Sequence, residues 1–296
     1  MTYRGRFAPS PTGPLHFGSL VAAVASWLDA RAAGGQWLVR IEDVDTTRTM
    51  PGAADDILRT LEAFGLSWDG EVAWQSRRTD LYEEALARLR AAGSVYRCKC
   101  SRREISDSGL AGPEGPIYPG TCRALRVPAS APGAERMIAP EGPMTFEDRV
   151  QGPIAQDVAR DIGDFVLKRR DGLHAYQLAV VVDDAEQRIS DVVRGADLLW
   201  STPRQVVLQR ALGLPTPRYL HVPVATNERG EKLSKQTLAR AVAADRAPET
   251  LRRALAFLGQ PASGGASVRE VLAAATVAWD IGRIPRAAAV TSGDRA

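Results

Sequence analysis

The chain has 296 residues and a formal net charge of +3, with 45% hydrophobic and 25% charged residues. At roughly 100 to 200 residues per domain, this length predicts two domains or one large domain with insertions, and the composition excludes a disordered, collagen-like or fibrous chain. No apolar run approaches the ~20 residues of a membrane span, and the start MTYRGRFAPSPTG lacks the apolar segment of a signal peptide. We therefore expect a cytoplasmic protein that does not associate with membranes.

The N-terminal third is predicted to be α/β in character. A short strand from Tyr3 to Ala8 is expected to end in the turn-forming run PSPTGP. The segment from Ser19 to Ala33 carries apolar residues at helical spacing and stops at a Gly-Gly pair. The apolar run WLVRI at 37–41 is then the second strand of a βαβ unit. Further helices are predicted at 52–64 and 79–92, and a strand begins at 95–98.

The composition changes from about Ser101 to Gly142, where Pro, Gly, Ser and short charged segments replace periodic apolar residues. This change predicts an inserted subdomain. Beyond it, regular structure is predicted at 164–168, 176–182, 192–194, 202–212 (a helix), 219–224 (a strand), 248–258 and 268–279 (both helices). These elements predict a Rossmann-type α/β core in two halves, 1–96 and 151–240. An insertion at 97–150 interrupts the core, and a helical region at 241–296 follows it.

A first candidate site lies where the N-terminal strand runs through a Gly/Pro turn into a helix. Such a junction presents free backbone N–H groups and the positive end of a helix dipole at the carboxyl edge of a sheet, where anions bind in open α/β folds. His16, one of three histidines, is placed at this helix entrance. On spacing alone, a capping or packing role for His16 is as well supported as a functional one.

A second candidate site is the polar loop NERGEKLSK at 227–235. Only four of the 38 basic residues are lysines, so the occurrence of Lys232 and Lys235 three residues apart indicates a need for compact ammonium groups. Two ammonium groups on a Gly-containing loop suit the transient neutralisation of a triphosphate. Taken alone, however, such a pair is usually part of a solvated face.

Together, HFGS at 16–19 and KLSK at 232–235 resemble the paired HIGH and KMSKS signatures of class I aminoacyl-tRNA synthetases. The segments RFAPSPTGPLHFGSL, RIEDVDTTR, YRCKCSRREI, HAYQLAVVVDDA and ISDVVRGADLLWSTPRQ follow the order of the glutamyl/glutaminyl branch. Ser19, Leu233 and Gln236 depart from the signatures, while both lysines are retained. The resemblance implies ATP, with Mg²⁺, as a substrate. It places His16, Lys232 and Lys235 in catalysis, and ATP binding at His16, Gly18, Ser19 and Lys235.

The amino-acid site follows from chemistry and from the resemblance. Glutamate presents two carboxylates and one ammonium, so its site needs cationic donors and an acidic partner. Arg6 and Arg194 fit the first requirement, and Glu42, just after the second strand, fits the second as a partner of the α-ammonium. Without the resemblance, Arg194 would be interpreted as a surface arginine. The resemblance implies a glutamate site made of Arg6, Phe7, Ala8, Pro9, Ser10, Glu42, Tyr176 and Arg194.

The three cysteines predict a metal site in the insertion. Cys98 and Cys100 are two residues apart, so on a strand both thiols would point to one face, and Cys122 returns after a loop of a length common in zinc sites. Three thiolates leave one tetrahedral position open. The resemblance implies that Tyr118 fills it in one structural zinc site per chain, although tyrosine is an unusual zinc ligand. The alternative is three reduced cysteines beside a packed tyrosine.

Within its branch the chain resembles the short members without an anticodon-binding domain, since the segment after Lys235 is too short for one. This resemblance implies activation of L-glutamate to glutamyl-adenylate and its transfer to the queuosine base in the anticodon of tRNA(Asp). We expect a monomer whose insertion contacts the nucleic acid. Two alternatives remain: a truncated glutamyl-tRNA synthetase that charges a tRNA 3′ end, and a non-catalytic tRNA-binding paralogue.

Overall fold

The N-terminal βαβ unit has the predicted topology. The computed structural model describes residues 2–232, 240–262 and 264–291. Its first elements are β1 (Arg4–Phe7), α1 (Phe17–Ala32) and β2 (Gln36–Ile41). β1 and β2 pair in parallel, with Arg4 opposite Gln36 and Phe7 opposite Val39, and β3 (Ala73–Trp74) continues the sheet beyond β2. This parallel pairing fixes the carboxyl ends of β1 and β2 at one edge of the sheet.

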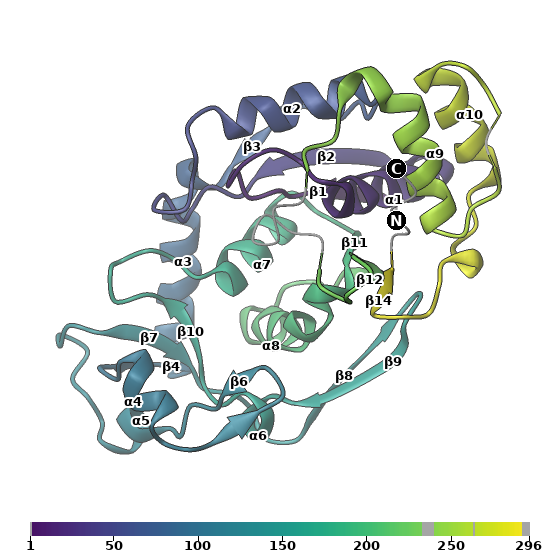
Figure 1. Cartoon of the computed structure of the whole chain (residues 1–296). Helices are drawn as coiled ribbons and strands as arrows, with labels where there is room; N and C mark the ends of the chain where they lie inside the picture. Colours follow the sequence, from purple (N-terminus) through teal and green to yellow (C-terminus); the bar gives the residue numbers. More distant parts are fainter. Residues whose placement is uncertain (1, 233–239, 263, 292–296) are drawn as a thin grey trace.

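A second parallel pair continues this arrangement. β11 (Asp191–Gly195) and β12 (Arg218–Val222) pair in parallel, and β12 is followed in the sheet by β8 (Pro143–Asp148) and β9 (Gly152–Asp157). Two hydrogen bonds join Arg4 to Ser190, which directly precedes β11. The start of β11 therefore lies against the start of β1 (Figure 1).

Helix α1 lies at the centre of the first hydrophobic core, which explains why ten of its residues are buried. It packs against β1 and β11 on one side and against α9 (Ala247–Phe257) and α10 (Val268–Ala278) on the other (Figure 1). A helix covered on several sides is apolar nearly all round rather than along one stripe. α2 (Ala53–Ala63) adds Ile57 and Leu61 to the same core.

A second hydrophobic core lies among the helices of the central region. Its helices are α3 (Thr79–Ala91), α7 (Tyr176–Glu186) and α8 (Thr202–Leu212). They pack beside an antiparallel sheet made of β4 (Val95–Cys98), β7 (Ala134–Met137) and β10 (Phe165–Lys168). The strands of this sheet come from both sides of the domain boundaries predicted at 96/97 and 150/151. The predicted division of the chain into domains therefore remains a prediction.

The remaining short elements belong to the insertion and to the C-terminal region. The insertion contains α4 (Arg102–Ser106), β5 (Ala111–Gly112), β6 (Gly115–Pro116) and α5 (Thr121–Ala124), and α6 (Val158–Asp161) follows β9. Short stretches of 3-10 helix occur at Gln75–Arg77, Ala196–Ser201, Ala244–Arg246 and Ile281–Arg283. Near the C-terminus, β14 (Ala289–Thr291) pairs in parallel with β13 (Val224–Thr226), which leads into the loop that carries Lys232.

Two predicted elements differ from the structure, and several observed strands were not predicted. The stretch from Tyr219 to Val224 is two strands, because Pro223 lies between β12 and β13 and proline has no N–H for a sheet ladder. Helix α7 continues four residues past the predicted end at Val182. The β8–β9 hairpin and β7 were not predicted, because they are short, polar segments without an apolar run.

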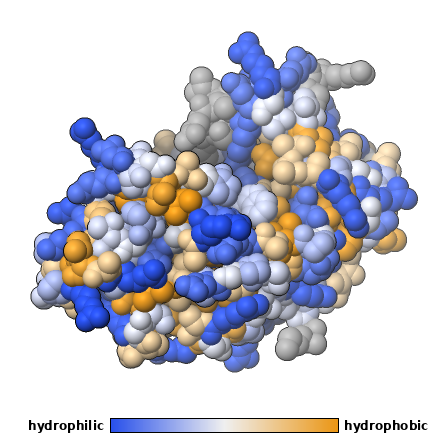
Figure 2. Space-filling view, turned by 90° about the horizontal axis from the view of Figure 1, so that it is seen from below, coloured by the Kyte–Doolittle hydropathy of each residue, from blue (hydrophilic) through white to orange (hydrophobic). Residues whose placement is uncertain are grey.

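The surface is mixed in character. On the face shown in Figure 2, hydrophilic residues surround small groups of hydrophobic ones. The large apolar side chains that are exposed, such as Leu125, Trp200 and Val277, belong to different elements. In the described part of the chain, no helix is both long and apolar enough to span a membrane.

Candidate active site and metal cluster

A pocket of about 570 Å³ opens where β1, β2 and β11 end. It is lined by the predicted glutamate residues Arg6, Phe7, Ala8, Pro9, Ser10, Glu42, Tyr176 and Arg194. The predicted nucleotide and catalytic residues His16, Gly18, Ser19 and Lys232 line the same pocket. Lys235 lies outside the described residues. Segments more than 200 residues apart in sequence thus meet at the carboxyl edge of the parallel strands, the place where open α/β folds bind ligands.

His16 caps the N-terminus of α1 and also faces the pocket. Its Nδ1 accepts a hydrogen bond from the Ser19 backbone N–H at 3.3 Å, and its Nε2 lies 3.0 Å from Ser19 Oγ. The backbone N–H groups of the first helical turn add positive potential at this end of the pocket. Capping and a role in the pocket are therefore compatible for this histidine.

Arg6 is held by a buried carboxylate. Its Nε and Nη2 atoms lie 3.2 and 3.3 Å from the two oxygens of Asp184, and both side chains are less than 10% exposed. Arg40 approaches the same carboxylate, with Nη2 at 2.8 Å. Although burial acts to raise it, the neighbouring Arg6 and Arg40 hold the pKa of Asp184 below its usual value. Asp184 is consequently an anion that fixes the direction of the Arg6 guanidinium.

Glu42 belongs to the same buried group of charges. Its Oε1 lies 3.2 Å from Arg40 Nη2, and its backbone N–H donates to the Pro9 carbonyl. Burial raises the pKa of Glu42, while Arg40 and Arg6 oppose that rise. An added ammonium group beside this carboxylate would stabilise its ionised form, as expected for a partner of an amino group.

Asp183 completes the neutralisation of this group. It contacts Arg78 at 2.6 Å and Arg40 at 3.6 Å, and it accepts hydrogen bonds from Gln75 and Tyr82. The arginines at positions 6, 40 and 78 thus face the carboxylates of Glu42, Asp183 and Asp184. The charges of this group balance without a ligand.

Arg194 differs from these arginines because its partners are neutral. Its Nη2 donates to Thr202 Oγ1 and Gln205 Oε1, both at 2.8 Å, and its Nη1 donates to the Tyr176 hydroxyl at 3.3 Å. Its Nε donates to His221 Nε2 at 3.0 Å. Arg194 is 5% exposed, and within the described ranges no carboxylate forms an ion pair with it. A buried guanidinium at a pocket wall without a carboxylate favours an anionic ligand.

Lys232 enters the pocket from the loop after β13. Its Nζ lies 2.6 Å from Asp197 Oδ2, and both side chains are partly exposed. Both residues line the pocket, Asp197 from the 3-10 turn after β11. Lys232 therefore brings to the pocket an ammonium group that is paired with Asp197.

Several residues that shape the site were missed by the sequence analysis. Arg40, Asp183 and Asp184 orient Arg6 and Glu42, and His221 contacts Arg194. A charged residue within the apolar strand WLVRI, and two acids within the apolar helix at 176–186, were the available signals. Such interruptions of an apolar pattern indicate buried, paired charges.

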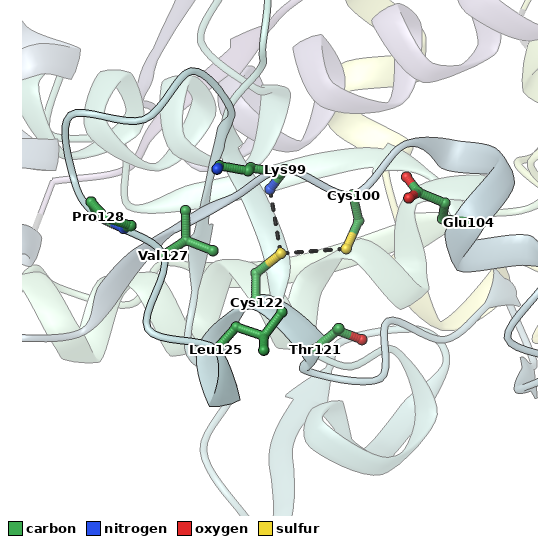
Figure 3. A pocket seen from close by; sticks show the side chains of 8 residues that line it. All are labelled: Lys99, Cys100, Glu104, Thr121, Cys122, Leu125, Val127 and Pro128. Atoms are coloured by element: carbon green, nitrogen blue, oxygen red, sulfur yellow. Dashed lines mark hydrogen bonds between the residues drawn. The ribbon is translucent and has the colours of Figure 1, made fainter.

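The three cysteines converge next to Tyr118. Their sulfur atoms all lie within 4.8 Å of one another, and Cys100 Sγ is 3.4 Å from Cys122 Sγ. Figure 3 shows these two sulfurs facing each other, with the Lys99 backbone N–H directed at Cys122. The Tyr118 hydroxyl lies 3.3 Å from Cys98 Sγ and 3.9 Å from Cys100 Sγ. The sequence thus predicted the convergence, but Cys98 is the last residue of β4 and Cys100 lies beyond it, so the two do not share a strand face.

This arrangement has the dimensions of a tetrahedral metal site. Four ligands about 2.3 Å from a zinc ion would lie roughly 3.8 Å apart, close to the separations of these sulfurs and of the phenol oxygen. Cys98, Cys122 and Tyr118 are each less than 5% exposed, and the Arg136 guanidinium lies 3.9 Å from the centre of the Tyr118 ring. The three cysteines are therefore close enough together that they could hold a metal ion.

Comparison with known proteins identifies the class of the fold and site. Residues 2–277 match the family described as tRNA synthetases class I (E and Q), catalytic domain. The glutamate-tRNA synthetase of Elizabethkingia anophelis superimposes with a TM-score of 0.81 at 25% sequence identity, over 98% of this chain and 68% of that one. The chain belongs to the class I tRNA synthetases of the glutamyl/glutaminyl branch, and the predicted fold class is confirmed.

Relatives of nearly the same length as this chain share a more specific name. Proteins named glutamyl-Q tRNA(Asp) synthetase are similar to this chain in Dechloromonas aromatica, at 59% identity over 96% of both chains, and in Aromatoleum aromaticum, at 58% over 96% of this chain and 91% of the relative. The protein of that name from Neisseria meningitidis is 52% identical over 98% of this chain and 99% of its own length.

Proposed function

We propose that this protein activates L-glutamate with ATP and transfers it to the queuosine base in the anticodon of tRNA(Asp). In the first step a glutamate α-carboxylate oxygen attacks the α-phosphorus of ATP, the bond from that phosphorus to the bridging oxygen breaks, and pyrophosphate leaves. In the second step a hydroxyl of queuosine attacks the carbonyl carbon of glutamyl-adenylate, loses its proton and displaces AMP. The relatives of matching length and name support this acceptor.

The observation that carries the amino-acid assignment is the environment of Arg194. The positive charges near β1 and β2 already have carboxylate partners, whereas the contacts of Arg194 among the described residues are all with neutral groups. The side-chain carboxylate of glutamate would supply the missing anion, assisted by the Tyr176 hydroxyl. Glu42 would receive the α-ammonium, with Arg6, Ser10 and the strand-end residues Phe7, Ala8 and Pro9 forming the rest of the wall.

The nucleotide would bind at the opposite side of the same pocket. His16, Gly18 and Ser19 place a helix N-terminus and an imidazole there, and Lys232 adds an ammonium group. We assign Lys235 to the α-phosphate, where charge grows in the transition state. Mg²⁺ accompanies ATP as part of this substrate and neutralises its phosphate charge. These side chains position and neutralise, and they need form no covalent bond to the substrate.

We assign zinc to the cysteine cluster. Cys98, Cys100, Cys122 and Tyr118 would hold it, and it would supply structural cross-linking of the insertion. The cluster is built from β4, the loop after it and α5, so a bound ion ties three segments of the insertion together. No acid, base or nucleophile of the glutamate pocket lies in this cluster.

The test measures activation and acceptor separately. Glutamate-dependent exchange of pyrophosphate into ATP would demonstrate activation. Transfer would then be measured with radioactive glutamate on tRNA(Asp) that carries queuosine, on the same tRNA with unmodified guanosine, and on an isolated anticodon stem-loop with queuosine. We expect labelling of the first and third substrates and not of the second, because an extruded base must be bound in the site.

The outcomes distinguish the alternatives. Labelling that requires an intact tRNA 3′ end and persists without queuosine would identify a truncated glutamyl-tRNA synthetase. Absence of exchange, together with binding of tRNA, would identify a non-catalytic paralogue. A tRNA with a 3′-deoxy terminus is the suitable control, because periodate would also cleave the diol of queuosine.

A further inference from the structure

We propose that Asp148 and His221 are positioning residues that orient Arg194 for the side-chain carboxylate of the amino acid. They form a buried hydrogen-bonded series that runs from the end of β8, through β12, to the pocket wall on β11. The inference rests on the proposed function, since it concerns the residue assigned there to the glutamate carboxylate.

His221 connects the two charged residues. Its Nδ1 lies 2.6 Å from Asp148 Oδ2, and its Nε2 lies 3.0 Å from Arg194 Nε. A guanidinium Nε–H can only donate, so Nε2 must be the accepting nitrogen and the proton must sit on Nδ1. Burial lowers the pKa of His221 to about 4, although Asp148 opposes the shift, which agrees with a neutral ring. His221 is completely buried in the described structure.

Asp148 fixes this tautomer. Its Oδ1 accepts backbone N–H groups of Val150, Gln151 and His221 at 2.9–3.2 Å, which leaves Oδ2 for the imidazole. Although burial acts to raise it, the hydrogen bond from His221 holds the pKa of Asp148 below its usual value. The result is a fixed anion that holds the neutral ring in the tautomer whose Nε2 accepts from Arg194.

The consequence is a guanidinium whose remaining donor capacity lies on Nη1, beside the Tyr176 hydroxyl. His221 occupies Nε, while Thr202 and Gln205 occupy Nη2, so the plane of the Arg194 guanidinium is set from the side away from the pocket. A direct carboxylate partner would have neutralised Arg194 and competed with the ligand. A neutral acceptor orients the group and leaves its charge available to an anion.

The test uses two substitutions of His221, and the side-chain amide of each replaces one nitrogen of the imidazole ring. In His221→Asn the amide occupies the place of Nδ1, so the contact with Asp148 is kept and the acceptor for Arg194 is lost. In His221→Gln the amide occupies the place of Nε2, so the acceptor is kept and the contact with Asp148 is lost. We expect His221→Asn to raise the KM for glutamate at least tenfold and to leave the KM for ATP within twofold, while His221→Gln stays within threefold for both.

The Asp148→Asn variant tests whether Asp148 determines which ring nitrogen of His221 carries the proton. An amide nitrogen facing Nδ1 would force the ring proton to Nε2, which then meets the Arg194 Nε–H, donor against donor. We expect a rise of at least tenfold in the KM for glutamate. In ¹⁵N-histidine NMR spectra the wild-type protein should show His221 neutral with the proton on Nδ1, and Asp148→Asn should lose that signature. The control is His174→Asn, at a buried histidine outside the pocket, which should leave both KM values within twofold.

A purely structural role predicts a different pattern. If His221 only supports the fold, Asn and Gln should act on thermal stability and on both KM values together, and that result would overturn the inference. Unchanged glutamate KM in His221→Asn, in an otherwise active enzyme, would overturn it alone. A wild-type protein that neither binds glutamate in calorimetry nor exchanges pyrophosphate would overturn the proposed function and this inference with it.

Discussion

Lys232 and Asp197 form an ion pair of 2.6 Å across the mouth of the pocket. Because both side chains are partly exposed, the pair contributes at most about 1 kcal/mol. Lys232 can therefore leave Asp197 for a triphosphate at little cost. We predict that Asp197→Asn lowers the KM for ATP by no more than about fivefold and leaves the KM for glutamate unchanged in pyrophosphate-exchange assays. A tenfold increase in the KM for ATP would show instead that Asp197 contributes to nucleotide binding.

The loop lysine beyond the described residues should contribute mainly to the transition state. If Lys235 neutralises charge that develops at the α-phosphate, Lys235→Ala should lower the rate of pyrophosphate exchange by about 10² or more, with glutamate binding nearly intact. Lys235→Arg should restore little, because a planar guanidinium does not replace a compact ammonium. Exchange near the wild-type rate in Lys235→Ala would refute the assignment.

Arg6 and Arg194 should respond differently to the same substitution. Arg6→Met leaves the buried Asp184 with Arg40 alone, so we expect a loss of about 3 kcal/mol in the free energy of unfolding, the lower end for a broken buried pair. Arg194→Met removes a buried charge that has no carboxylate partner, which offsets the cost of leaving its neutral acceptors unsatisfied, so its loss should be smaller than that of Arg6→Met. Both variants should lose glutamate binding, measured by calorimetry, alongside urea unfolding. Equal destabilisation would contradict the difference in charge pairing.

The metal prediction concerns the order of the insertion. Purified protein should contain about one zinc per chain, and Cys98→Ser or Cys122→Ser should lose both the zinc and the order of the insertion, because metal binding contributes directly to folding. Elemental analysis and limited proteolysis measure the two effects. Zinc retained in Tyr118→Phe would remove only the tyrosine from the ligand set, whereas metal-free protein with an ordered insertion would exclude a zinc requirement.

Acid should weaken the fold through His221. Its pKa is lowered to about 4 in the folded state, from 6.5. As pH falls below 6.5, the unfolded chain takes up a proton that the folded protein excludes, so stability declines until pH 4, by about 3 kcal/mol at most. His221→Gln removes this contribution. Urea unfolding at several pH values between 7 and 4 should show a smaller decline in that variant, and equal declines would contradict the burial of a neutral ring.

Local patterns predicted much of the fold. The βαβ unit, the helix at 202–212 and the C-terminal helices were predicted within a few residues, because each has a long apolar pattern with clear glycine or proline ends. β7 and the β8–β9 hairpin lack a long apolar pattern. Their pairing depends on partners distant in sequence, such as Tyr219 against Asp148.

The site residues that belong to sequence motifs could be predicted. The residues whose charges pair only in the folded structure could not. The pairing of Arg6 with Asp184 spans 178 residues, and that of Asp148 with His221 spans 73. No local spacing relates these positions. A sequence can indicate that a charge within an apolar segment needs a partner, but the identity of the partner is a property of the fold.

The pairing of β13 with β14 affects the order in which the parts of the pocket form during synthesis. Val224–Thr226, from which the Lys232 loop departs, pairs with Ala289–Thr291. Domains begin to fold while the chain is still being synthesised, so the β1–α1–β2 unit can form long before β14 has left the ribosome. The support of the loop is then assembled last. A nascent chain would have the pocket residues of β1 and β2 early and acquire the support of its Lys232 loop only once β14 has been synthesised.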